Sequence, residues 1–527
     1  MSEGPPEAIP PLEENRALRT KVAELSDENK SLQQQLDWFK RQLFGRKSEK
    51  CAFENPEQIQ LGLGEDADAA CPEEELEDIS YRRRKKQRGN SVTDSGLRFD
   101  ENVPVQVIQI PAPELEGLSE DEYELIGEKV THRLAQRIGS YVVLEYRRPV
   151  AKLLETERIC AAPAPPAIFD RTMADVSFLA GLLADKFSYH LPLYRQHLRL
   201  ADAGIRLSRA TLTHYAQRSI DLLEPIYDAQ LRHILMSRVL AVDETPIKAG
   251  RKRKKKPKKP GQMRSAWFWP IYGEEHEVCF SWAETRGAEH LENVLKGFRG
   301  ILLSDGYQAY DSYAEAKSEV VQAQCWSHTR RYFERAKDGD PAAMTALQKI
   351  ASIYRIETEI RMRDLNGDWK LRHRGTHAKP LVEDFLKWCR NERLRSDLVD
   401  SDLLTKALKY AINHEAELQV YLGDPGVPID TNHLERTLRV IPMGRKNWLF
   451  CWTEVGARHV GIIQSLLTTC RLHGVDPCTY LVDVLQRVST QPSDQVHDLT
   501  PRRWKELFAG DPLRSDLESA GASDAVV

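Results

Sequence analysis

Residues 238–245 read Arg-Val-Leu-Ala-Val-Asp-Glu-Thr, and residues 300–306 read Gly-Ile-Leu-Leu-Ser-Asp-Gly. Each stretch is a short apolar run of the kind that forms a buried strand, and each ends in an acid, Asp243 or Asp305. Gly306 permits a sharp turn away from the sheet after the second acid. Neighbouring strand ends would bring the two carboxylates together. An Asp after a strand is also a common turn residue or helix cap, so this pair by itself is weak support for catalysis.

Further patterns lie between the two acids. Residues 267–272 and 277–282 are strand candidates joined by a short hairpin-type connection at 273–275, and residues 288–296 look helical. Three strands, a helix and a fourth strand, with acids on the first and fourth, is the order of an RNase H-like core. We therefore expect a multidomain α/β chain built around such a mixed sheet.

A third acid comes from residues 429–436, which read Ile-Asp-Thr-Asn-His-Leu-Glu-Arg. Asp430 or Thr431 can cap a helix that starts here. The first turn of that helix presents Asn432 and Glu435 on one face. The assignment of Glu435 rests mainly on this motif, whereas Asp243 and Asp305 are also placed by the ends of predicted strands.

Glu435 lies 130 positions after Asp305, which is far more than a simple core needs. Helical patterns cover residues 342–364 and 403–422 in between. We therefore expect an all-α insertion that interrupts the core over residues 338–425.

Three acids without a His/Cys cage point to phosphoryl transfer. Mg²⁺ prefers hard oxygen ligands and keeps open positions for water or phosphate oxygens. Two such ions about 3.5–4 Å apart can activate a hydroxyl nucleophile and stabilise a leaving oxyanion together. An open cluster of carboxylates suits this chemistry.

The N-terminal region carries a heptad pattern that predicts a homodimerising coiled coil over residues 12–44. The alternative is one amphipathic helix packed on its own chain. One seam has Leu18, Leu25, Leu32 and Phe39, and the other has Asn15, Val22, Asn29, Leu36 and Leu43. Residues 45–102 lose this periodicity and read as a flexible, charged linker, whose basic run 82–86 is either solvated or bound to phosphates.

Residues 103–166 alternate apolar and polar positions, which predicts a small β-rich module closed by the stiff connector 161–166. Residues 167–235 look helical, with Gly204 at a turn and Ser208 as the N-cap of the next helix. Arg209 and Thr211 on that helix could read DNA as in a helix-turn-helix, although plain helical hairpins are common.

Seven stretches resemble the signature blocks of IS66-family insertion-sequence transposases, in the family's order. They are residues 43–50, 188–196, 241–246, 303–310, 325–331, 430–436 and 444–450. The resemblance covers roughly residues 15–50 and 160–490. It implies a DDE triad of Asp243, Asp305 and Glu435 that holds Mg²⁺, with Mn²⁺ as a substitute, and an all-α insertion in the core.

The same resemblance implies a function and partners. The expected activity is cleavage and joining of DNA at terminal inverted repeats, by a homodimer or higher oligomer and with accessory proteins from the same element. The expected location is the bacterial cytoplasm, on the nucleoid when DNA is bound. No membrane partner is expected.

The cysteines depart from the family pattern. Many relatives carry two Cys-x-x-Cys pairs before the stretch that corresponds to 161–166, whereas only Cys160 stands there in this chain. One thiolate cannot hold structural Zn²⁺, so zinc is not expected and apolar packing should stabilise the module.

Cys325 and His328 are three residues apart, but two ligands make a poor zinc site. Together with Asn432 they are expected to support the active site.

Several basic residues are candidate phosphate contacts, each with a solvated surface as the alternative. They are Arg251, Lys252, Arg330, Arg331, Arg445 and Lys446. Trp448 could stack on a base but fits the core better.

The whole-chain composition bounds these readings. The 527 residues carry a net charge of −4, so any DNA binding must come from local basic segments. No stretch approaches about 18 consecutive apolar residues, and nine scattered cysteines favour reduced thiols in a cytoplasm. The expected divisions are 12–44, 45–102, 103–166, 167–235, 236–337, 338–425, 426–490 and a C-terminal tail at 491–527.

Three functions fit this organisation. An active DDE transposase is the leading hypothesis. A catalytically silent DNA-binding regulator derived from a transposase is the alternative, and an RNase H-like nuclease without joining activity is the third.

Overall fold

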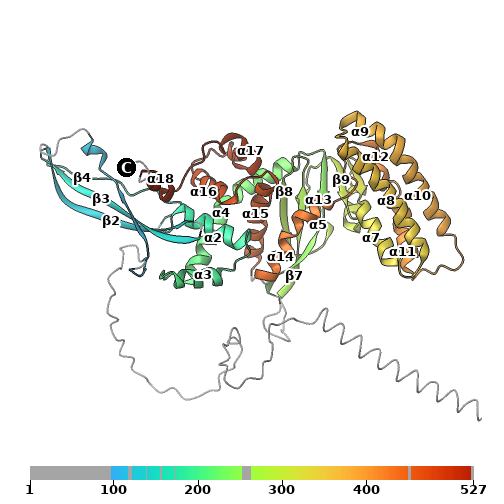
Figure 1. Ribbon diagram of the computed structural model, residues 1–527, viewed down its shortest axis with the longest axis horizontal. Coiled ribbons are helices and arrows are strands. Elements are labelled where there is room, and N and C mark those ends of the chain that lie inside the picture. Colours follow the sequence, from blue (N-terminus) through green and yellow to red (C-terminus); the bar gives the residue numbers. More distant parts are fainter. Residues whose placement is uncertain are drawn as a thin grey trace, which may run out of the picture. The chain divides into compact units, whose positions relative to one another are not determined.

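The computed structural model describes residues 97–523 apart from 102, 117–121, 138, 155–156, 171, 252–262 and 449–452 (Figure 1). The chain divides into the units 1–85 and 86–527, and all described residues belong to the second. The predicted coiled coil at 12–44 and the basic run at 82–86 lie outside the described residues. None of the described helices is long and apolar enough to cross a membrane.

The central sheet has the strand order β10–β9–β5–β7, with β6 and β8 also paired to β7. Strands β5, β9 and β10 are parallel, and β7 runs antiparallel to β5, β6 and β8. Since β5 and β6 both pair with β7, they are two halves of one interrupted strand. This is the topology of an RNase H-like core, which confirms the sequence prediction. The strands are β5 (Val239–Val242), β6 (Thr245–Arg251), β7 (Met263–Tyr272), β8 (Val278–Ala283), β9 (Gly300–Ser304) and β10 (Val320–Gln324).

Strand β5 is buried on both faces, which explains why its sequence is apolar throughout instead of alternating. Leu240 and Val242 belong to a cluster around Trp269, which α5 (Ala288–Val294) and α6 (Gln308–Glu315) complete. Val239 and Ala241 belong to the larger cluster on the other face, to which α15 (Glu454–Leu472) contributes. Helices on both faces therefore fix the register of the strand that leads to Asp243.

Helix α15 covers the edge of the sheet at β8. One side of the helix presents Gly461, Ser465 and Thr469, which recur every fourth residue. Phe280 N donates to Ser465 Oγ at 2.8 Å, and Val278 N donates to Thr469 Oγ1 at 3.2 Å. These hydroxyls satisfy backbone donors that an edge strand would otherwise leave unpaired.

Replacing Gly461 with alanine should destabilise the protein. A Cβ at this position would lie 2.5 Å from Phe280 O, so α15 would have to move away from β8. We expect a loss of about 1–3 kcal/mol in the free energy of unfolding, measured by urea denaturation. Gly423→Ala is the matched control, because nothing lies within 4 Å of its added Cβ. Equal effects of the two substitutions would contradict this account of the α15–β8 contact.

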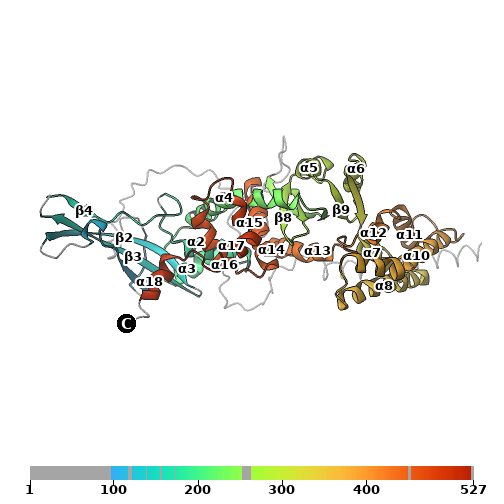
Figure 2. The ribbon, with the colours of Figure 1, turned by 90° about the horizontal axis from the view of Figure 1, so that it is seen from above.

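The segment between β10 and α13 (Asn432–Leu438) is all-helical, and Figure 2 shows its helices gathered into one bundle. Trp326, Phe333 and Phe385 form its aromatic centre and are fully buried. The bundle begins at Trp326, just after β10, and Trp326 N donates to Ile429 O, on the segment that leads to α13, at 3.1 Å. Its elements are α7 (Trp326–Ala336), α8 (Pro341–Met362), α9 (Gly367–His373), η3 (Arg374–Ala378), α10 (Lys379–Glu392), α11 (Leu403–Asn413), η4 (Glu417–Gln419) and α12 (Val420–Gly423).

The N-terminal part of the described chain is a four-stranded sheet with the order β1–β3–β2, in which β4 also pairs with β3. Cys160 is buried against Ala112 and Ala151. Leu97 is fully buried and Phe99 pairs with Ile205, so these two residues, expected to belong to the end of the linker, pack against the rest of the chain. The strands are β1 (Val105–Gln109), β2 (Tyr123–Arg137), β3 (Ser140–Leu153) and β4 (Ile159–Ala161), and a 3₁₀ turn, η1 (Pro113–Leu115), follows β1.

Three helices connect this sheet to the core: α2 (Val176–Phe187), α3 (Leu193–Asp202) and α4 (Arg209–Ile234). Ser208 caps α4 by accepting from Thr211 N at 3.0 Å, as the sequence predicts. Gly204 has a φ of 79°, which is the left-handed conformation that the turn between α3 and α4 requires.

The segment expected to be a C-terminal tail at 491–527 is structured over most of its length. Trp504 is buried and its Nε1 donates to Asp483 at 2.9 Å. Asp516 accepts from the Tyr146 hydroxyl at 2.6 Å, so the C-terminal segment contacts the N-terminal sheet. The C-terminal helices are α14 (Val440–Trp448), α15, α16 (Pro477–Arg487), η5 (Val496–Leu499), α17 (Pro501–Leu507) and α18 (Asp516–Ser523).

Candidate active site

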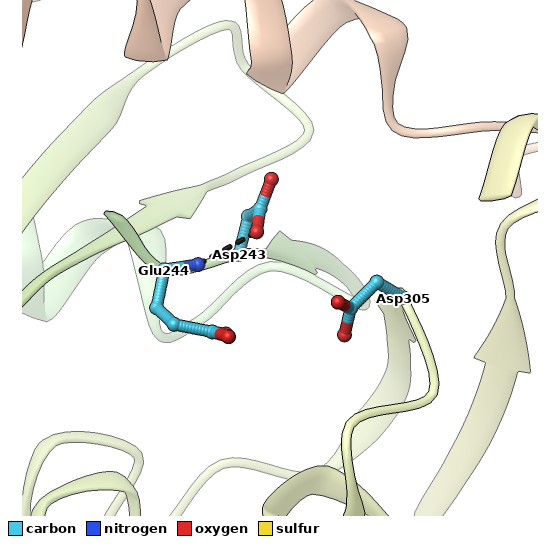
Figure 3. Close-up of side chains that lie close together, drawn as sticks. All are labelled: Asp243, Glu244 and Asp305. Carbon is cyan, nitrogen blue, oxygen red and sulfur yellow. Dashed lines mark hydrogen bonds between the residues drawn. The ribbon is translucent and has the colours of Figure 1, made fainter. Parts of the chain in front are cut away.

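Asp243 and Glu244 occupy the break between β5 and β6, and Asp305 directly follows β9. Because β5 and β9 are parallel neighbours in the sheet, their carboxyl ends meet at one edge. Ligand oxygens of the three carboxylates lie within 4.8 Å of one another (Figure 3). Within the described part of the chain, this is the single group of three or more His, Cys, Asp or Glu residues placed to share a metal ion.

The electrostatics of the cluster centre on Asp243. Burial, reinforced by the negative charge of Asp305, raises the pKa of Asp243 to about 7. One Asp243 oxygen accepts from Glu244 N at 2.7 Å, which partly offsets these effects. Asp305 is held by Tyr307 N, which donates to its Oδ1 at 3.0 Å. The carboxylates of Asp243 and Asp305 are therefore held close together, and the nearby positive charge does not offset their repulsion.

The stability of the metal-free protein should depend on pH through Asp243. Its folded pKa of about 7 lies above the ordinary value of 3.8, so the folded state binds an extra proton between these values. The stabilisation is complete below pH about 4 and is lost as the pH rises through about 7. We expect the free energy of unfolding of the wild type, relative to Asp243→Asn, to fall between pH 5 and pH 8 in EDTA. A pH-independent difference between these two proteins would contradict the prediction.

Glu244 is an acid of this cluster that the sequence reasoning did not single out. Its side chain is 2% exposed and accepts from Arg286 Nε at 2.9 Å and from the Tyr310 hydroxyl at 2.6 Å. Burial raises its pKa, while the bonds from Tyr310 and Arg286 oppose that rise. The guanidinium of Arg286 lies 3.7 Å from the ring centre of Tyr307. Since Glu244 already has these partners, it is held as a support of the site.

Glu435 lies on the first turn of α13 but outside this cluster. Its carboxylate forms an ion pair with Arg331, and its Oε1 lies 3.9 Å from His328 Nε2. His328 in turn is close enough to Asp305 for that charge to influence its pKa. The structure therefore brings Asp243 and Asp305 together and places Glu435 outside their cluster, in contact with Arg331 and near His328.

Cys325 connects the strand that carries Asp305 to the helix that carries Glu435. Its N donates to Ser304 O at 3.0 Å, and its sulfur accepts from both N and Oγ1 of Thr431 at 3.2 Å. Burial would raise the pKa of the Cys325 thiol, but the hydrogen bond with His328 lowers it overall. Asn432, the other expected support, binds Asp430 through its N at 3.0 Å and its Nδ2 at 2.6 Å.

The candidate DNA contacts are spread over several elements. Arg330 and Arg331 lie on α7, and Arg445 on α14 donates to Pro246 O. Arg209 is exposed at the start of α4, 5.6 Å from the ring centre of Tyr194, with Thr211 on the same turn. The side chains of Arg251, Lys252, Lys446 and Trp448 lie outside the described part of the structure.

The order of these motifs along the chain matches a known family. A family model described as "Transposase IS66 family" matches residues 171–459, which contain all three acids and the helical bundle. The chain belongs to the IS66 family of DDE transposases. The "IS66 C-terminal element" model matches residues 465–502, and a model described as "Transposase C of IS166 homeodomain" matches residues 31–107.

Two proteins that are similar to this IS66-family chain come from Sinorhizobium fredii, and both are named as uncharacterized. The protein y4hP is 28% identical and the match covers 91% of this chain and 89% of y4hP. The protein y4jD is 29% identical, with 92% and 96% covered. These alignments span nearly the full length of each relative.

Solved structures of the Mos1 transposase also match. The Mos1 paired-end complex with the left transposon end is 12% identical at a TM-score of 0.13, covering 50% of this chain and 82% of that chain. The Mos1 strand transfer complex is 15% identical at a TM-score of 0.12, covering 30% and 59%. The assignment of an RNase H-like core rests on the strand order of this chain's own sheet.

Proposed function

We propose that this IS66-family chain is an active transposase that cleaves DNA at the terminal inverted repeats of its element. The freed 3′-hydroxyl then attacks target DNA in strand transfer. The observation that carries the proposal is the convergence of Asp243 and Asp305 at the ends of neighbouring strands in an RNase H-like sheet. A relic that only binds DNA has no physical need for two clustered carboxylates, which repel each other.

The donor set suits Mg²⁺, or Mn²⁺ as a substitute, held by Asp243, Asp305 and Glu435. Carboxylate oxygens are the ligands that these hard cations prefer. The raised pKa of Asp243 supports the assignment, because a bound cation would relieve the repulsion between Asp243 and Asp305. When bound, a pair of such ions activates a hydroxyl nucleophile and stabilises the leaving oxyanion. Glu435 joins the set once its carboxylate leaves Arg331.

The chain's own residues would hold the DNA and orient the acids. Tyr307 and Tyr410 fix Asp305, the first through its carboxylate and the second through its backbone carbonyl. Cys325 ties α13 to the end of β9, which keeps Glu435 within reach. The basic side chains would contact phosphates, and binding should weaken steeply with salt. We assign phosphate contact to Arg251, Lys252, Arg330, Arg331, Arg445 and Lys446, and DNA reading to Arg209 and Thr211.

Two kinds of partner complete the proposal. A homodimer or higher oligomer, paired through the heptads at 12–44, would hold two element ends. Accessory proteins encoded by the same element would be the second kind of partner. Zinc is not part of the proposed machinery.

The test uses the full-length protein, Mg²⁺ and labelled duplexes that carry the inverted repeats flanking its gene. We expect nicked ends and joined products from the wild type. Asp243→Asn should bind the same duplexes without nicking them. Wild-type protein that binds the repeats and never nicks them would favour the silent regulator. Nicking without joined products would favour an RNase H-like nuclease.

A further inference from the structure

A cleft opens between α7 and α8 and reaches the first turn of α13. We call it the α7–α8 cleft. Its volume is about 650 Å³, within the range of about 300–1,000 Å³ typical of sites for small organic groups. Arg331 and Asn432 belong to its lining, so the cleft begins where Glu435 is held.

The lining of the cleft combines an apolar floor with a cationic rim. Met344, Leu347 and Tyr354 on α8 form the apolar part. The Tyr354 hydroxyl donates to Asp430 at 3.0 Å, so the ring is fixed as a wall. Among the described residues that line it, the cleft has one acid, Glu334, and four cations. The cations are Arg330, Arg331, Lys337 and Arg355.

The apolar floor and the cationic rim together match a nucleotide better than either of them would alone. Guanidinium groups bind phosphate oxygens through charge-assisted hydrogen bonds, and apolar or aromatic surfaces take the face of a base. Met344 is 47% exposed, which leaves its side chain accessible on the floor. A continuous duplex cannot insert a stacked base into such a cleft, whereas an unpaired nucleotide can.

We propose that the α7–α8 cleft binds one unpaired nucleotide of the DNA strand next to the cleavage site, and that its phosphate draws Arg331 away from Glu435. The proposal rests on the proposed function. Arg331 now pairs with Glu435 and also lines the cleft, so one guanidinium serves either the carboxylate or a phosphate. DNA in the cleft thereby releases Glu435 toward Asp243 and Asp305. The metal site is completed only when DNA is in place.

The first test measures DNA binding in EDTA, where no cleavage occurs. The wild type should bind a duplex with an unpaired nucleotide at its end about tenfold more tightly than the blunt duplex, by fluorescence anisotropy. Ala351→Trp fills the cleft from an exposed position on α8 and should abolish this preference. Thr345→Trp is the matched control, because Thr345 is exposed on the same helix and does not line the cleft. A preference that survives in Ala351→Trp would overturn the proposal.

The second test measures Mn²⁺ binding by the loss of the free-ion electron paramagnetic resonance signal. The unpaired-end duplex should raise the Mn²⁺ affinity of the wild type about tenfold. It should leave the Mn²⁺ affinity of Ala351→Trp unchanged. The Asp243→Asn protein, measured with the same DNA, gives the background binding. Arg331→Ala should show the higher affinity without DNA, and Arg331→Ala/Glu435→Gln should lose it. Equal affinities with and without DNA in the wild type would overturn the coupling. If Asp243→Asn binds Mn²⁺ like the wild type, the proposed function itself fails.

Discussion

Asp305→Asn is expected to lower the rate of Mg²⁺-dependent strand cleavage by a factor of about 10³ or more. A bound cation contributes several kcal/mol to stabilising charge in the transition state, and each 1.36 kcal/mol is a factor of about ten. Asparagine keeps the size of the side chain and can still accept from Tyr307 N. The measurement is single-turnover nicking of a labelled inverted-repeat duplex.

The loss should be confined to chemistry. Asp305→Asn should bind DNA like the wild type and, in EDTA, should be no less stable, because it removes the repulsion with Asp243. Asp311→Asn is the matched control: it is the same change on α6, at a residue bonded to Gln322 and outside the acid cluster. If both substitutions slow nicking equally, Asp305 has no special part in the reaction.

Arg374→Ala is expected to cause the largest loss of stability, about 3–5 kcal/mol in the free energy of unfolding. Arg374 has no exposed surface and donates to both carboxylate oxygens of Glu357, at 2.7 and 2.9 Å. It also donates to the carbonyls of Tyr421 and Asp424 at 2.6 and 2.9 Å. Removing it leaves a buried carboxylate and two carbonyls without their donor. Urea denaturation of the full chain measures the loss.

A double variant separates the charge from the packing. Arg374→Met/Glu357→Leu removes the buried carboxylate together with its partner, and should recover much of the loss. The exposed pair Arg390–Glu415 on the same bundle provides the control, and Arg390→Ala should change stability little because solvent screens that pair. A double variant as unstable as Arg374→Ala would show that the two carbonyls dominate.

The sequence predicted the strands of the core because they are short, uninterrupted apolar runs. Residues 239–242 and 301–303 are apolar at every position, which suits strands buried on both faces. The short connection at 273–275 allowed one reading, a hairpin between β7 and β8. Two neighbouring strand ends then predict the meeting of Asp243 and Asp305.

Two features of the site could not be read from the chain. Adjacent strand residues normally point to opposite faces, so nothing placed Glu244 beside Asp243 until the break between β5 and β6 was seen. Likewise, the spacing to Glu435 says nothing about its partner. Arg331 precedes it by 104 residues, and only the tertiary structure brings the two side chains together.

The acidic residues of the site show what the sequence determines and what the tertiary structure decides. By themselves, the residues determine the strands, the helices and the positions of Asp243 and Asp305, because these depend on local periodicity and on the pairing of neighbouring strands. The tertiary structure alone decides that Glu244 is neutralised by Arg286, that Arg331 holds Glu435, and that a cationic cleft adjoins them. Those contacts join segments far apart in the chain, and their energies depend on burial and geometry that no local pattern encodes.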